Sequence, residues 1–135
     1  MGFFLRIVLT TALVNLAPAV AQAPKKAAPA LQKEFDGFME PFRAALKAND
    51  SAAVAGMTRL PFMNDSAIRD AAQFRAKTYA TFFTAKNRAC IQNGKAVYDR
   101  DQEKNDYYSV FCGQHIFVFT KTKAGFLFTD IGAND

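Results

Sequence analysis

The side chain with the widest chemical scope in this sequence is its single histidine, His115. It alternates with Phe117 and Phe119, so a β-strand would place all three side chains on one face. Asp130 alternates in the same way with Phe128 on a later strand. If the two strands are neighbours, this carboxylate is placed to orient the imidazole as a general base. A histidine that only packs at the rim of a sheet fits the same pattern, and Asp130 equally fits a strand end held by backbone donors.

The chain contains 14 phenylalanines and no tryptophan, and these rings fill a core or line a cavity. A cavity is expected between the first helix and the last strands, on the phenylalanine face, because that face also carries the polar groups that would orient a ligand. The opposite face of these strands is apolar too, so alternation alone leaves the inward face open. The competing expectation is that the rings interdigitate and leave no cavity. The ligand-pocket candidates are Phe38, Phe42, Phe62, His115, Phe117, Phe119, Phe128 and Asp130.

No other pattern predicts a cofactor, a metal or a catalytic residue. The acidic run from Asp99 to Asp106 lacks the central glycine and closing glutamate of a calcium loop, and basic residues interrupt it, which favours a solvated hairpin. One histidine and two cysteines far apart in the sequence do not form a zinc motif. No serine lies in a nucleophile-elbow context.

The two cysteines, Cys90 and Cys112, allow one intramolecular disulfide. The alternative is two separate buried thiols. A disulfide requires an oxidising compartment, and the start of the chain supports one.

Residues 1–21 have the pattern of a cleavable signal peptide. Arg6 gives the segment a positive charge, a short apolar run follows, and the small residues Ala-Val-Ala end at Ala21. The apolar run is shorter than the roughly 20 residues that span a bilayer, which argues against a retained anchor. Cleavage after Ala21 leaves Gln22 at the new N-terminus, whereas cleavage after Ala23 is less favoured because a proline follows. The mature protein is therefore expected in the periplasm or outside the cell, without a transmembrane segment.

The formal charge of +5 is spread along the chain and forms no concentrated stripe, which argues against a nucleic-acid partner. The expected partners are instead a small apolar ligand or another envelope protein. Nothing in the sequence indicates an oligomeric state.

Residues 22–30 are rich in alanine, proline and lysine and are expected to form a flexible tether. Residues 31–135 then form a single domain. Apolar residues at helical spacing predict a helix from Leu31 to about Lys47, with Pro41 inside it, and Asp70 is predicted to cap a later helix. After residue 94 the period changes to two, which predicts strands near 96–99, 107–112, 115–120 and 126–131. The fold class is therefore α+β, with N-terminal helices packed on a curved antiparallel sheet of about four strands.

Several segments together give a loose resemblance to a known superfamily. They are Leu60-Pro61-Phe62, Cys112-Gly113, Phe117-Val118-Phe119 and the closing run from Asp130 to Asp135. In this pattern the chain resembles small exported bacterial proteins of the nuclear-transport-factor-2-like superfamily. The resemblance implies a cone-shaped α+β domain whose curved sheet wraps around an N-terminal helix. That superfamily holds ketosteroid isomerases and dehydratases beside binding domains, and no local motif carries their catalytic roles to residues of this chain.

Two functions follow as expectations. The first is an exported, non-catalytic binding or accessory module for a small apolar ligand, a peptide or an envelope protein. The alternative is a small cone-fold enzyme of the isomerase or dehydratase kind. A cavity that brings two ionisable groups within hydrogen-bond reach would favour the enzyme.

Overall fold

The computed structural model describes Ala12, Val14 and residues 25–135. The predicted signal-peptide cleavage site at Ala21 lies outside the described residues, as do residues 22–24 of the predicted tether. Within this part of the chain, no helix is both long enough and apolar enough to cross a membrane.

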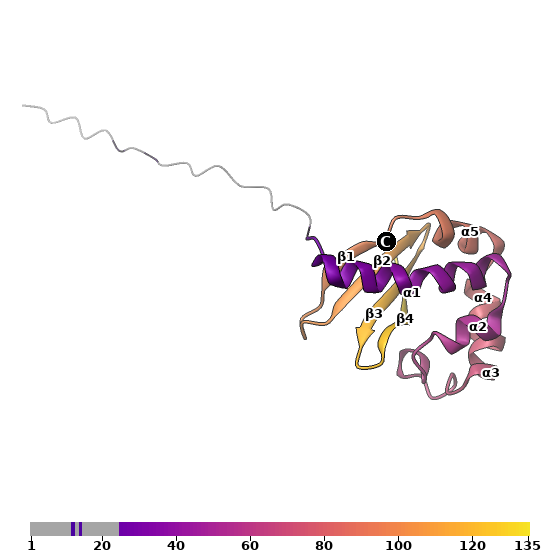
Figure 1. The fold of residues 1–135 in the computed structure, drawn as a ribbon. Helices are drawn as coiled ribbons and strands as arrows, with labels where there is room; N and C mark the ends of the chain where they lie inside the picture. The colour runs from indigo at the N-terminus through magenta and orange to yellow at the C-terminus, as the bar shows by residue number, and fades with distance from the viewer. Residues whose placement is uncertain (1–11, 13, 15–24) are drawn as a thin grey trace, which may run out of the picture.

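The longest helix, α1 (Pro29–Lys47), crosses in front of the four strands in Figure 1. It begins inside the predicted tether because Pro29 occupies its first turn, where the missing N–H of proline is tolerated. Lys25, also predicted to be tether, donates a hydrogen bond to Asp99 on the sheet at 2.8 Å. The predicted apolar face is confirmed, with Phe35, Met39, Phe42 and Leu46 buried.

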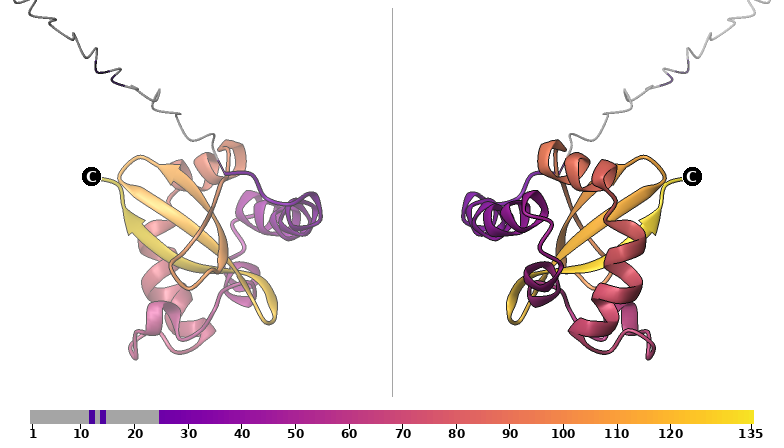
Figure 2. Two further views of the ribbon diagram at one scale, coloured as in Figure 1. Left: turned by 90° about the vertical axis from the view of Figure 1, so that its left-hand side faces the viewer. Right: turned by 90° about the vertical axis from the view of Figure 1, so that its right-hand side faces the viewer.

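Shorter helices follow α1 and surround one end of the sheet (Figure 2). Asp50 caps the helix that begins at Ser51, and Asp70 caps the helix that begins at Ala71, where its side chain accepts a hydrogen bond from the Gln73 N–H at 2.8 Å. The segment after Asp70 is continuous through residue 82 but contains a central π-helical stretch. The helical elements are α2 (Ser51–Gly56), η1 (Phe62–Asn64), α3 (Ala71–Gln73), η2 (Phe74–Tyr79), α4 (Ala80–Phe82) and α5 (Ala85–Asn93).

The sheet is an antiparallel meander in which each strand pairs with the next, so the spatial order is β1-β2-β3-β4. All four predicted strands are present, and β3 and β4 extend two residues beyond their predicted ends. The strands are β1 (Val97–Arg100), β2 (Asp106–Cys112), β3 (His115–Thr122) and β4 (Gly125–Ala133). Helices that precede an open, curved antiparallel sheet confirm the predicted α+β class.

A β-bulge interrupts the pairing of β3 with β4. Phe119 lies opposite Phe128, but Val118 lies opposite Asp130, so Thr129 is an extra residue in β4. The Thr129 hydroxyl lies 3.3 Å from the Val118 carbonyl and 2.7 Å from the Thr120 hydroxyl. Because a bulge shifts the alternation of side chains by one residue, β4 exchanges its faces at this point.

The core lies between the helices and the inner face of the sheet, and aromatic rings fill it. The ring of Phe35 stacks on that of Tyr108 with centroids 3.7 Å apart. Phe128 occupies the centre of the cluster, with ring centroids 5.2 to 6.3 Å away. Its neighbours are Phe42, Phe62, Phe74, Phe83, Phe117 and Phe119.

The predicted disulfide is confirmed. Cys90 in α5 and Cys112 at the end of β2 are joined by an S–S bond of 2.14 Å. It ties the helical half of the domain to the sheet across 22 positions of sequence.

Candidate functional site

Most of the predicted pocket residues lie in the core. Phe42, Phe117, Phe119 and Phe128 are each 0% exposed. Phe38 is half-buried and packs against Phe42 with ring centroids 5.8 Å apart. In the gap between α1 and the last strands, the phenylalanines therefore interdigitate, as the competing expectation stated. Of the eight candidates, Phe62 and His115 line a large open space.

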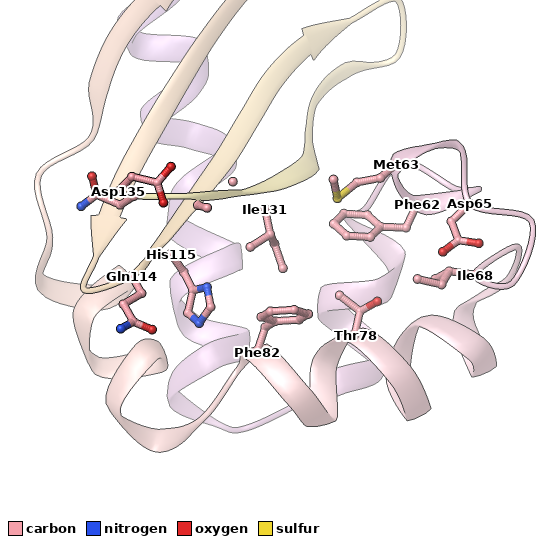
Figure 3. A pocket seen from close by; sticks show the side chains of 13 residues that line it. Phe62, Met63, Asp65, Ile68, Thr78, Phe82, Gln114, His115, Ile131 and Asp135 are labelled. Carbon is pink, nitrogen blue, oxygen red and sulfur yellow. The ribbon is translucent and has the colours of Figure 1, made fainter.

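That space is a groove of about 920 Å³ beside the C-terminal end of β4. We call it the terminal groove. It lies between η1, the helical segment that ends in α4, and residues 131–135 (Figure 3). A groove of this size accommodates a small ligand or a few side chains of a partner. Its apolar lining is provided by Phe62, Met63, Ile68, Phe82 and Ile131.

Figure 3 shows the side chains of Phe62, Phe82, His115 and Ile131 directed toward a common space. The rings of Phe82 and His115 pack edge to face, with centroids 5.3 Å apart and planes at 88°. Thr78 adds a polar group from the π-helical stretch and is only 2% exposed. The terminal groove is therefore mainly apolar, with a few polar groups able to orient a bound molecule.

The loop from Phe62 to Ile68 forms the rim of the terminal groove and closes on itself. The Phe62 N–H donates to the Ile68 carbonyl at 2.9 Å, and the Asp65 carboxylate accepts from the Ala67 N–H at 2.8 Å. Met63 and Asn64 have positive φ values of 52° and 58°, which side chains other than glycine rarely adopt. This backbone places Met63 at the rim with 47% of its surface exposed.

Asp130 does not face His115, which corrects the prediction of a shared face. Asp130 pairs with Val118, on the opposite face of β3 from His115 and Phe117. The cause is the bulge at Thr129, which moves Asp130 outward and turns Ile131 inward, opposite Phe117. On the outer face the Asp130 carboxylate lies 3.9 Å from the Arg59 guanidinium.

His115 lies at the start of β3, after the turn at Gly113 and Gln114, and is half-buried. The end of β4 is fastened over this turn because the N–H of Asn134 donates to the Gln114 carbonyl at 2.9 Å. Within residues 25–135, His115 forms no ion pair with a carboxylate. The imidazole therefore offers a terminal-groove ligand a hydrogen bond and an aromatic edge, without the orienting carboxylate of a general base.

Sequence reasoning missed most of the terminal groove. Ile131 was missed because strict alternation placed it on the face opposite Phe128, and the phenylalanine face was expected to line the cavity. Phe82 was not among the predicted pocket residues. The sequence pointed to this place only through Phe62 and His115, which were both predicted as pocket residues.

Comparison of the chain with protein-family models, curated protein sequences and solved structures finds no match. Membership of the nuclear-transport-factor-2-like superfamily stays a prediction. The geometry of the terminal groove is therefore the main basis for a functional proposal.

Proposed function

We propose that this chain is an exported, non-catalytic binding module that takes an apolar group of its ligand into the terminal groove. The observation that carries the proposal is the groove itself: about 920 Å³ of open space beside a core that is otherwise filled by aromatic rings. Small-molecule and peptide sites are typically concave and mostly apolar, with a few polar groups that fix orientation.

The arrangement around His115 supports binding over the enzyme alternative. An isomerase or dehydratase moves protons between positioned ionisable groups. Here the candidate partner Asp130 lies on the outer face with Arg59, and His115 packs against Phe82.

Export is supported by two features that are independent of the terminal groove. Residues 1–21 have the composition of a signal peptide, and Cys90 and Cys112 form a disulfide. Disulfides persist in the periplasm and outside the cell, whereas cytosolic thiols are kept reduced.

Binding of Nile red, a neutral dye that fluoresces in apolar sites, tests the proposal. We expect saturable binding that Ile131→Asp weakens by about tenfold, since a charge beside the dye replaces an apolar contact. Leu127→Asp is the matched control, because Leu127 is half-buried on the same strand but lies on the opposite face. It should leave the dissociation constant within about twofold.

Circular dichroism must show that both variants fold. If the dye does not bind, or if the two variants weaken it equally, the terminal groove is not the binding site and the proposal fails.

A further inference from the structure

One edge of β4 faces away from β3. Along the first half of β4, this far edge is already paired with another segment of the chain, around Thr58. The Phe128 N–H donates to the Met57 carbonyl and the Arg59 N–H donates to the Phe128 carbonyl, both at 2.9 Å. This is a parallel bridge centred on Thr58. The pairing segment leaves the edge at Pro61, which has no N–H to continue the ladder.

Beyond the bulge, the same edge of β4 is open. The Asn134 N–H points toward the β3 side, where it bonds to Gln114. Because backbone groups alternate in direction along a strand, those of Ile131 and Ala133 point away from β3. Among residues 25–135, neither of these two residues has a backbone hydrogen-bond partner on the far edge. Unpaired donors and acceptors on a strand edge are a template for another extended chain.

This open edge borders the terminal groove. Ile131, Gly132 and Ala133 all line it, and Gly132 can do so only through its backbone. The side chain of Ile131 points into the same space in Figure 3. An extended peptide paired with the edge would therefore place alternate side chains beside Phe82 and Ile131.

The charged residues that line the terminal groove indicate which peptides it would bind. Asp65 and Asp135 are the acidic residues of its described lining, and neither lysine nor arginine is part of that lining. The chain as a whole carries a formal charge of +5, so this acidic lining is a local departure from the basic average. Charge complementarity favours a ligand with basic residues.

We propose that the terminal groove binds an extended peptide that adds a strand to β4 at Ile131 and Ala133. The peptide inserts an apolar side chain between Phe82 and Ile131 and presents one basic residue to Asp65 and another to Asp135, which lie at opposite ends of the terminal groove in Figure 3. The inference rests on the proposed function and goes further, because it names a peptide backbone as the recognised group. In strand addition, main-chain hydrogen bonds give affinity and side-chain pockets give specificity.

The experiment uses the oxidised protein and a fluorescein-labelled probe peptide, Lys-Val-Phe-Val-Lys-Val, in fluorescence polarisation. Two further probes carry N-methyl groups on alternate residues, one probe for each of the two backbone edges. We expect one methylated probe to bind like the parent and the other to bind at least about tenfold more weakly, because only one edge faces β4. Replacing both lysines by glutamates should also weaken binding about tenfold at low salt.

A variant pair tests the protein side of the same contact. Ala133→Pro removes an N–H that points away from β3, so the β3–β4 ladder keeps its bonds, and peptide binding should weaken about tenfold. Ala133→Ser keeps the N–H and should bind as the wild type does. The methylated probes need no variant, so they decide the matter even if Ala133→Pro does not fold.

The outcomes separate the two proposals. If Nile red binds in the terminal groove but both methylated probes bind as tightly as the parent peptide, or no peptide binds, strand addition is wrong and the groove takes only apolar groups. If Nile red itself does not bind in the groove, the proposed function fails first.

Discussion

The hydroxyl of Tyr108 lies at the margin of the aromatic core, where it donates a hydrogen bond to the side-chain oxygen of Gln32 at 2.9 Å. The ring stacks on Phe35, and the residue is only 1% exposed. Burial disfavours the tyrosinate and raises the pKa of Tyr108 to about 12, with a smaller contribution from the nearby Asp36 carboxylate. This residue therefore couples protonation to the stability of the core.

Stability is predicted to fall as the pH rises from 10 to about 12. Below pH 10, Tyr108 is protonated in both states and contributes no pH dependence, because its ordinary pKa is 10.0. Between pH 10 and about 12 the unfolded chain releases a proton that the folded chain retains, so the free energy of unfolding decreases. Urea denaturation at a series of pH values in this window measures the slope.

Tyr108→Phe is the control for this slope. It removes the titrating hydroxyl and keeps the ring, so the decrease should be shallower than in the wild type. It should not vanish, because burial also raises the pKa of Tyr79 and Tyr107. An identical slope in the two proteins would show that Tyr108 does not titrate in this way.

Among the elements, α5 is held from two sides. From α1, the Arg43 guanidinium donates to the carbonyls of Ile91 and Gly94, each at 3.3 Å. From the sheet, the disulfide joins Cys90 of α5 to Cys112 of β2. A helix of nine residues is too short to be stable alone, so these attachments and the buried Ile91 keep it folded.

Removing the disulfide is predicted to lower the free energy of unfolding by about 3 kcal/mol, because the unfolded chain regains the freedom of the closed loop. The double variant Cys90→Ala/Cys112→Ala and the reduced wild type should both show the loss in urea denaturation. Adding reductant to the double variant is the control and should change nothing. An unfolding midpoint equal to that of the oxidised wild type would contradict the prediction.

The strand β4 shows most clearly which features of the structure could be predicted from the sequence. The period of two correctly located the strand and its core residue Phe128. It placed Asp130 on the wrong face because a bulge depends on pairing with β3, and nothing local distinguishes Thr129 as the extra residue. The fold class and the disulfide were predictable from pattern and cysteine count, since both depend on short-range or counted features.

The terminal groove was not predictable in the same way. It forms where the loop after Pro61, the helix that ends at Phe82 and the end of β4 meet, and these segments are far apart in sequence. Phenylalanines at core spacing looked equally suited to line a cavity or to fill one. Packing decides between these outcomes, and it places Phe42, Phe117 and Phe119 in the filled core.

For the whole molecule, export is predicted to remove residues 1–21. The protein recovered from an extracytoplasmic fraction should begin at Gln22, as measured by intact mass and N-terminal sequencing. Ala21→Leu should block this cleavage because a large residue replaces the small one beside the cut. Ala23→Leu is the control and should be processed normally. A chain that still begins at Met1 would contradict the prediction.

The position of Phe128 in the last strand has a consequence for the order of folding. Helical elements that begin near residue 29 bury their aromatic faces against a residue of β4, the final element of the fold. A chain growing from its N-terminus therefore cannot complete this core until β4 has been synthesised and is free to pair, because the completing contacts are long-range. If the chain is exported as proposed, it therefore crosses the membrane before these contacts can form.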